Sequence, residues 1–266
     1  MSPVGPALTS IHNPHVKFAR SLAHRKVRHR ERAFVVEGVR LFEDALNAGF
    51  RPLRLFFDPS RIDGSLMQRI QALGAEDTLA HEVTPAVIAA IAETDSPQGI
   101  AAIFEFPDVP IMQDTEASLF VVADGIKDPG NLGTLLRSAA AAGTHAVFIS
   151  PRTADPYAPK VVRAAMGAHF RLPIRPLDWD APDPMLASCT QLLGAEAGEG
   201  IPYDAVDWRQ PSAVILGSEA TGISERAVSQ LTGYVTIPMH GEVESLNAAV
   251  AGAVILFEAA RQRRSQ

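Results

Sequence analysis

The sequence predicts an α/β fold in two parts: a C-terminal domain built on a mostly parallel sheet, and a smaller N-terminal α/β domain. From Leu119 onward, short apolar strands alternate with helices, which is typical of a parallel sheet covered on both faces. Before that point, Phe106–Ser118 contains two prolines and several acidic residues between apolar segments, as linkers often do. A length of 266 residues, 47% of them hydrophobic, suffices for two cores. We therefore expect domains at 1–107 and 118–266, joined by a linker at 108–117.

The N-terminal elements follow from periodicity and capping. Helices are expected at 14–23 and 38–48, and strands at 53–57, 79–83 and 99–106. Between the last two strands, Thr84 is a good N-cap, Pro85 suits the first helical position, and apolar residues continue to Ile91. These elements predict a small α/β unit without repeats.

The C-terminal elements alternate more regularly. Strands are expected at 119–123, 146–150, 172–175, 213–216 and 235–238, and helices at 131–142, 160–166, 185–193 and 246–263. The last helix has one apolar stripe, formed by Leu246, Val250, Ala253, Val254 and Phe257, and further apolar residues lie off that stripe. A helix that is apolar nearly all round is buried on more than one side. A second subunit is the simplest partner for the second side.

Composition excludes several classes of protein. The chain has one cysteine, so neither an intramolecular disulfide nor a cysteine-cluster zinc site is expected, and no metal site is visible in the pattern of ligands. The longest apolar stretch, Leu246–Phe257, is too short to cross a bilayer. The N-terminus has no apolar core of a secretory signal. We expect a cytoplasmic protein.

Charge is distributed unevenly. The net charge of −6 argues mildly against nucleic-acid binding. However, the segment 17–32 carries a local charge near +6, because its basic residues are opposed by Glu31 alone. This segment is either a surface that follows RNA phosphates or a solvated helix face, and charge alone leaves both open. The candidate RNA-binding residues are Lys17, Arg25, Lys26, Arg28 and Arg30.

A first stretch with chemical potential runs from Asp124 to Gly143, at the end of a strand and the start of a helix, where α/β proteins place ligands. Asp128 and Pro129 are typical of an N-cap and a first helical residue. Asn131 and Arg137 fall on one slanting row along the helix. An ordinary capped surface helix remains the alternative. The stretch has neither the P-loop spacing nor the dinucleotide-binding glycine pattern, which argues against a dinucleotide-dependent enzyme.

Two further stretches follow strands. Gly217-Ser-Glu219-Ala-Thr-Gly222 comes directly after an apolar strand, and its glycines permit a close backbone approach. In the stretch 237–251, Ser245 is expected to cap the last helix, which places Asn247 in its first turn. An amide in an apolar helix needs a hydrogen-bonding partner. His240 has no metal-binding neighbours in sequence, and we interpret it as a loop residue.

Together and in this order, the three stretches resemble the motifs of the SpoU/TrmH family of SPOUT methyltransferases, over Leu119 to about Arg263. The matching patterns are Asp128-Pro129-x-Asn131-x-Gly133 with Arg137, Gly217-x-Glu219-x-x-Gly222, and Ile237-Pro238-Met239 with Ser245-Leu246-Asn247. The first hundred residues resemble the L30e-like substrate-binding domain of ribosomal RNA members, through Phe34–Leu46 and Ser96–Ile100. Ala220, Ala248 and Ala249 depart from residues that are common in the family.

The resemblance implies a function and a site. It implies transfer of a methyl group from S-adenosylmethionine to a ribose 2′-hydroxyl, most readily in 23S ribosomal RNA, by a homodimer whose active sites form at the dimer interface. It also implies a deep trefoil knot in the C-terminal domain. By position, the cofactor would contact Gly217, Ile237 and Leu246. The implied catalytic residues are Arg137, Asn131, Glu219, Ser245 and Asn247.

Two alternatives stay open at this stage. The RNA could be transfer RNA rather than ribosomal RNA, although the extra N-terminal domain favours ribosomal RNA. The chain could also be a catalytically silent RNA-binding protein that keeps the knotted fold, although the presence of Asn131, Arg137, Glu219 and Asn247 argues against this. The sequence names neither the target nucleotide nor the group that accepts the 2′-hydroxyl proton.

Overall fold

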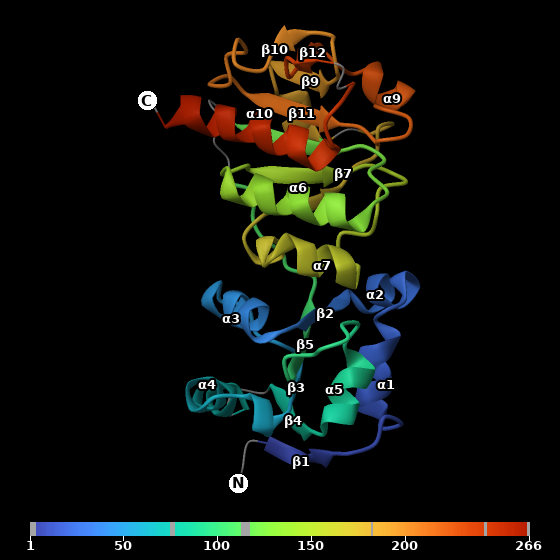
Figure 1. The fold of residues 1–266 in the computed structure, drawn as a ribbon, viewed down its shortest axis with the longest axis vertical. Helices are drawn as coiled ribbons and strands as arrows, with labels where there is room; N and C mark the ends of the chain where they lie inside the picture. Colours follow the sequence, from blue (N-terminus) through green and yellow to red (C-terminus); the bar gives the residue numbers. More distant parts are fainter. Residues whose placement is uncertain (1–3, 75–77, 113–117, 182, 242–243, 265–266) are drawn as a thin grey trace. The chain divides into compact units, whose positions relative to one another are not determined.

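The computed structural model describes residues 4–74, 78–112, 118–181, 183–241 and 244–264. The chain divides into two compact units (Figure 1). The first comprises Met1–Pro107 and Tyr157–Arg163, and the second comprises Asp108–Pro156 and Ala164–Gln266. Part of the predicted linker, 113–117, lies outside the described residues, and the domain boundaries given above stay a prediction.

The first unit is built on a mixed five-stranded sheet with the order β1-β4-β3-β5-β2. Its strands β1, β4 and β3 are parallel, whereas β5 runs antiparallel to both β3 and β2. The elements are β1 (Val4–Leu8), α1 (Pro14–Ser21), α2 (Arg25–Glu31), β2 (Ala33–Glu37), α3 (Val39–Asn47), β3 (Arg54–Phe57), η1 (Pro59–Arg61), α4 (Gly64–Gly74), β4 (Leu79–Val83), α5 (Pro85–Ile91) and β5 (Ile100–Glu105). Periodicity had predicted α1, α3, α5 and the strands β3 to β5, but not β1, β2, α2 or α4.

The second unit is built on a seven-stranded sheet with the order β10-β12-β9-β11-β6-β7-β8. Every pair of neighbouring strands is parallel, as predicted. The elements are β6 (Leu119–Ala123), α6 (Pro129–Ala141), β7 (Ala146–Ile149), α7 (Pro159–Ala165, which begins in the first unit), η2 (Ala168–Phe170), β8 (Ile174–Pro176), α8 (Pro184–Ala187), β9 (Gln191–Ala195), β10 (Ile201–Pro202), β11 (Ser212–Leu216), α9 (Glu225–Val228), β12 (Gly233–Thr236) and α10 (Ala248–Arg263).

Successive side chains of the central strands point to opposite faces of the sheet, and helices cover both faces. On one face, Phe120, Phe148 and Ile215 pack with residues of α8 and α9. On the other face, α6 and α10 lie side by side (Figure 1). A side chain at Gly252 of α10 would come within 2.7 Å of both Leu135 of α6 and Leu216 of β11. The glycine therefore lets α10 approach both elements closely.

One predicted element was wrong. The segment 185–193 was expected to be a single helix, but it contains a four-residue helix, α8, followed by the strand β9. The helix is short because the chain then enters the sheet, where Leu192 and Leu193 pair with β11 and Leu193 also pairs with β12. An apolar run of this length fits a helix or a buried strand equally well, and tertiary pairing decides between them.

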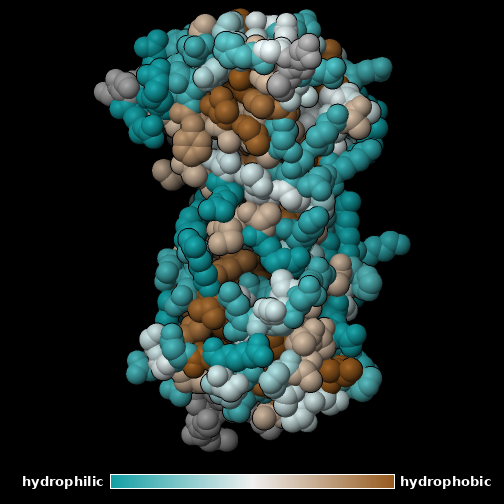
Figure 2. Space-filling model, in the orientation of Figure 1, coloured by the Kyte–Doolittle hydropathy of each residue, from teal (hydrophilic) through white to brown (hydrophobic). Residues whose placement is uncertain are grey.

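The final helix also begins later than expected. It starts at Ala248, and its N-cap is Asn247 rather than Ser245. Its buried residues include Ala249, Gly252, Ile255 and Leu256. Of the predicted stripe, Leu246 precedes the helix, and Val250 and Phe257 lie on its outer side, where they remain 47% and 45% exposed. Figure 2 shows apolar side chains gathered on the surface where Figure 1 draws α10.

A buried histidine in the second unit generates a pH prediction. The ring of His169 in η2 donates a hydrogen bond from Nε2 to the carbonyl oxygen of Pro156, at 2.7 Å. Burial lowers the pKa of His169 to about 4, against a smaller opposing effect of that hydrogen bond. The folded state therefore keeps the ring neutral where the unfolded chain takes up a proton.

We predict that stability is lost as the pH falls from 6.5 toward 4. At pH 5 this histidine alone should lower the free energy of unfolding by about 2 kcal/mol relative to pH 7.5. Urea unfolding at both pH values measures the loss. His169→Gln retains a donor for Pro156 but cannot titrate. Its decrease in unfolding free energy between pH 7.5 and pH 5 should therefore be smaller than that of the wild type by about 2 kcal/mol. Equal losses in the wild type and the variant would contradict the assignment.

Candidate functional site

The candidate site lies at the carboxyl ends of the parallel strands β6, β9, β11 and β12. In open α/β sheets this edge is where loops gather and ligands bind. Three loops leave these strands and carry the residues singled out by the sequence: 124–128 after β6, 217–224 after β11, and 237–247 after β12. Residues 242–243 of the last loop lie outside the described residues.

The first loop ends in a capped helix, as predicted. The side chain of Asp128 accepts a hydrogen bond from the backbone N–H of Asn131 at 2.8 Å, and Pro129 occupies the first helical position of α6. The cap satisfies one of the free N–H groups at the helix start. It also fixes the first turn of α6, so the side chain of Asn131 is directed from a rigid position.

The second loop folds back on itself. Ser218 and Gly222 exchange two backbone hydrogen bonds, of 3.0 and 2.9 Å. A side chain at Gly217 would lie 2.3 Å from the backbone carbon of Gly222, and Gly222 has a φ of +63°. Both glycines are therefore required by the tight turn, which presents Glu219 at its tip.

Three predicted residues, two from these loops and one from the first turn of α6, meet through their side chains. The amide nitrogen of Asn131 donates to Oε1 of Glu219, and the amide nitrogen of Asn247 donates to Oδ1 of Asn131 at 2.9 Å. Asn131 is separated from these partners by 88 and 116 residues of sequence. The outer atoms of this polar cluster remain accessible to a ligand, because Glu219 and Asn247 are exposed and Asn131 is half-buried.

Asn247 also holds the start of α10. Its Oδ1 accepts from the backbone N–H groups of Ala249 and Val250, at 3.0 and 3.3 Å. The amide oxygen therefore caps the helix while the amide nitrogen binds Asn131. This double role replaces the predicted cap at Ser245, and it supplies the partner that the amide was expected to need.

A cavity of 360 Å³ adjoins the cluster. This volume is in the range that accommodates a small organic cofactor. Its lining residues come from the ends of β9, β11 and β12 and from the start of α10: Ala195, Glu196, Ala197, Leu216, Gly217, Ser218, Glu219, Gly222, Val235, Ile237, Met239, Ser245, Leu246, Asn247, Ala248, Ala251 and Ile255. The predicted cofactor residues Gly217, Ile237 and Leu246 are thus gathered around one cavity.

The charge of the cavity is negative. Among its lining residues within the described part of the chain, the charged side chains are those of Glu196 and Glu219. An apolar cavity that carries carboxylates suits a ligand with an apolar body and a positive charge. Sequence reasoning missed Glu196, although its position directly after an apolar strand was a usable signal. It also missed the role of Asp124, a buried carboxylate at the end of β6.

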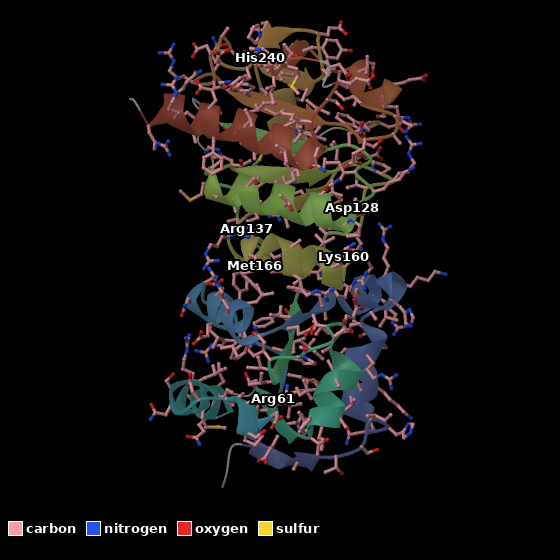
Figure 3. The ribbon with its side chains drawn as sticks, in the orientation of Figure 1. Arg61, Asp128, Arg137, Lys160, Met166 and His240 are labelled. Atoms are coloured by element: carbon pink, nitrogen blue, oxygen red, sulfur yellow. The ribbon has the colours of Figure 1, made fainter. Side chains whose placement is uncertain are left out.

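Arg137 is not brought into this cavity. It is exposed on α6, less than two turns beyond Asn131, and does not line the cavity of its own chain. Figure 3 shows Asp128 at the start of the helix and Arg137 further along it. Arg137 follows Asn131 by six positions in the helix, which corresponds to about 9 Å along the axis.

The basic segment of the first unit is mostly exposed, with one exception. Lys17, Arg25, Lys26 and Arg30 are exposed. Arg28 is 3% exposed, and its Nη1 donates to the carbonyl oxygens of Leu22 and Ala23 at 2.7 and 2.6 Å. It closes the end of α1, as basic side chains often do near helix C-termini.

Within the described ranges, the structure contains no cluster of three or more histidine, cysteine, aspartate or glutamate side chains arranged to hold a metal ion. Helices long and apolar enough to span a bilayer are likewise not found in these ranges.

Comparison with known families matches both parts of the chain. The SpoU rRNA Methylase family matches residues 118–257. The MRM3-like substrate binding domain matches residues 13–102.

Similar proteins match nearly the whole chain. The 23S rRNA (guanosine(2553)-2′-O)-methyltransferase RlmP of Bacillus subtilis is 31% identical, over 94% of this chain and 97% of its own length. The 23S rRNA (uridine(2479)-2′-O)-methyltransferase of Streptomyces viridochromogenes is 30% identical, over 99% and 95%. The crystal structure of an AdoMet-bound rRNA methyltransferase from Sinorhizobium meliloti has a TM-score of 0.85 and 32% identity, covering 97% of this chain and 98% of that one.

The double role of Asn247 generates a stability prediction. Asn247→Ala removes the helix cap and should cost about 1 kcal/mol of unfolding free energy. Asn247→Asp keeps an oxygen that can cap α10, but places a second oxygen against Oδ1 of Asn131. We expect Asn247→Asp to retain most of the stability that Asn247→Ala loses, while both variants break the link to Asn131. Chemical denaturation measures the difference. Equal destabilisation would show that capping is not a separate contribution.

Proposed function

Because the chain belongs to the SpoU rRNA methylase family, we propose that it transfers a methyl group from S-adenosylmethionine to a ribose 2′-hydroxyl of 23S ribosomal RNA. The observation that carries this proposal is the polar cluster of Asn131, Glu219 and Asn247 at the rim of the cavity. Such an arrangement binds a cofactor in one place and a polar nucleophile directly beside it. The two named relatives act on different nucleotides, so the target nucleotide is not assigned.

The cavity fits the cofactor chemically. S-adenosylmethionine supplies an activated methyl group on a positively charged sulfonium, and its adenosine part needs apolar surface. Leu216, Ile237 and Leu246 supply that surface. Gly217 leaves its backbone open to a ligand, and the carboxylates of Glu196 and Glu219 complement a positive charge.

The polar cluster is proposed to orient the ribose. Asn131 is held between Glu219 and Asn247, so its position is fixed before substrate arrives. Preorganised polar groups of this kind lower the cost of aligning two reactants. Ser245 lines the same cavity and can hydrogen-bond to the cofactor or the nucleotide.

Arg137 is proposed to stabilise the oxygen that becomes negative as the 2′-hydroxyl reacts, and to anchor a nearby phosphate. A guanidinium stays protonated at all accessible pH values, so it is a poor base but a good electrostatic partner for an alkoxide. The proton can then leave through the phosphate or through water.

A homodimer is proposed to complete the site. Val250 and Phe257 of α10 are about half exposed, and apolar side chains exposed together on one helix side often mark an interface. A second copy of the chain covers the stripe with an identical one, as in most symmetric dimers. The dimer also accounts for Arg137, which lies outside the cavity of its own chain.

The first unit is proposed to bind RNA through its basic surface. Lys17, Arg25, Lys26 and Arg30 are exposed cations on and around α1 and α2, suited to RNA phosphates. Arg28 is left out because its guanidinium is engaged by its own chain. The deep trefoil knot, the domain boundaries and the cytoplasmic location remain proposals that rest on the family resemblance and on the RNA substrate.

The proposed function is tested by methyl transfer from labelled S-adenosylmethionine to separated ribosomal and transfer RNA that lack native modification. We expect label at a 2′-O-methylated nucleotide of 23S RNA. Label in the transfer RNA pool would show that the substrate is transfer RNA rather than ribosomal RNA. Cofactor binding without label in either pool, or in assembled ribosomal particles, would favour a silent RNA-binding protein.

Arg137→Ala should reduce methyl transfer by at least about 100-fold, because an electrostatic contact made in the transition state is lost. Its affinity for S-adenosylmethionine should stay close to that of the wild type, because Arg137 does not line the cavity. Arg209→Ala, at an exposed arginine paired with Asp207, is the matched control. Near-normal turnover by Arg137→Ala would remove this residue from the mechanism.

Replacing Lys17, Arg25 and Lys26 together by glutamine should weaken RNA binding and flatten its dependence on salt. A plot of log K against log salt has a negative slope, and each lost phosphate contact should reduce the magnitude of that slope by about 0.7 to 0.9. RNA affinity measured at several salt concentrations gives the slope. An unchanged slope would place the basic segment on a surface that RNA does not touch.

A further inference from the structure

The carboxylate of Asp124 lies where β6 ends, and it is 3% exposed. Burying a charged group is costly unless every oxygen finds a donor. Here the donors come from three segments that follow three different strands: Ser150 after β7, Trp179 after β8, and Ser224 beyond β11. The side chain of Asp124 thus holds three segments together by hydrogen bonds at this edge of the sheet.

The two oxygens of the carboxylate have different partners. Oδ1 accepts from the hydroxyl of Ser150 at 2.6 Å and from Nε1 of Trp179 at 3.2 Å. Oδ2 accepts from the backbone N–H of Ser224 at 2.7 Å. A backbone N–H on a buried carboxylate forms a charge-assisted bond, which is stronger than a neutral one. The bond to Ser224 spans 100 residues of sequence.

Ser224 is the last residue of the loop that presents Glu219. The start of that loop is fixed as well, because the backbone N–H of Asp124 donates to the carbonyl oxygen of Leu216 at 2.8 Å. Asp124 therefore holds both ends of the 217–224 loop. Its backbone holds the strand from which the loop leaves, and its carboxylate holds the residue at which the loop enters α9.

The same residue begins the loop that leads to Asn131. The next backbone N–H, that of Gly125, donates to the hydroxyls of Ser150 and Thr153 at 3.2 and 2.9 Å. The loop 124–128 then reaches Asp128, the cap of α6. Asp124 is thus the shared anchor of two loops, one that leads into α6 and Asn131 and one that carries Glu219, and both side chains belong to the polar cluster.

We propose that Asp124 is a positioning residue for methyl transfer, which acts by tethering Ser224 and so fixes the 217–224 loop as one wall of the cofactor cavity. The inference rests on the proposed function. Asp124 does not line the cavity, so its effect passes through the loop. The sensitive feature is the bond from the Ser224 N–H to Oδ2, rather than the burial of Asp124 in general.

A pair of variants at Ser224 isolates this bond. The φ of Ser224 is −69°, which proline adopts without strain. Ser224→Pro removes the N–H that donates to Asp124, together with the side-chain oxygen that accepts from Ala227. Ser224→Ala removes the same side-chain oxygen but keeps the N–H. The two variants therefore differ mainly in the tether.

Two variants at the other end of the network complete the set. Asp124→Asn keeps the shape of the side chain, but either orientation of the amide sets its NH₂ against a donor, at Ser224 or at Ser150 and Trp179. Trp179→Phe removes one donor from Oδ1 and leaves the bond to Ser224 intact. It is the control for general loosening of the network.

The measurement is the dissociation constant of S-adenosylmethionine by calorimetry, alongside the thermal unfolding midpoint and amide exchange in 217–224. We expect Ser224→Ala and Trp179→Phe to bind the cofactor within about threefold of the wild type, a change below 1 kcal/mol. Ser224→Pro and Asp124→Asn should bind about tenfold more weakly or worse, with faster exchange in the loop. Loss of affinity should not follow the unfolding midpoint across the four variants.

The outcomes separate the two claims. If the wild type binds no S-adenosylmethionine, the proposed function fails. If the wild type binds it and Ser224→Pro matches Ser224→Ala in affinity and loop exchange, the tether is not what positions the loop, and the inference fails. If either Ser224→Pro or Asp124→Asn does not fold, the remaining one of these two variants is compared with Trp179→Phe. Equal cofactor affinity and loop exchange in that comparison would again contradict the inference.

Discussion

The hydrogen bonds that meet at Asn131 are the interaction on which the site depends. They join the start of α6, the tip of the loop after β11 and the cap of α10, which lie far apart in sequence. This is possible because a parallel sheet brings the carboxyl ends of its strands to one edge. It also requires that α6 and α10 pack closely side by side, which Gly252 permits by leaving room for Leu135 and Leu216. Asn131 therefore depends on the packing of the fold for its position, and it is also the central residue of the candidate site.

The parts of the site divide the work of methyl transfer. The cavity has apolar walls and negative charge, which we propose bind the cofactor, and the polar cluster at its rim has fixed hydrogen-bonding groups, which we propose orient a ribose. Arg137 stands apart from both and brings a permanent positive charge. Its separation from the cavity is one reason for the proposal that a second chain completes the site. In the other unit, exposed cations of the basic segment are proposed to supply the non-specific part of RNA affinity.

Local signals in the sequence were sufficient where a structure depends on neighbours in the chain. The cap formed by Asp128 and Pro129 and the parallel strands were predicted correctly, whereas burial of the last helix on a second side stays a prediction. Errors arose where two local solutions compete: Ser245 and Asn247 are both good caps two residues apart, and Leu192–Leu193 fits a helix or a strand. The burial of Arg28 and the network around Asp124 depend on contacts that only the folded chain creates. Spacing and residue type contain no record of them.

The most direct test of the central claim asks whether the cavity beside Asn247 is the cofactor site. Titration calorimetry with S-adenosylmethionine should give about one binding site per chain for the wild type. Binding should be at least about tenfold weaker for Leu246→Trp, because the bulky indole ring fills the cavity. Leu53→Trp, at an exposed leucine of the other unit, should bind as the wild type does. Unchanged binding by Leu246→Trp, with its fold intact, would contradict the account and place the cofactor elsewhere.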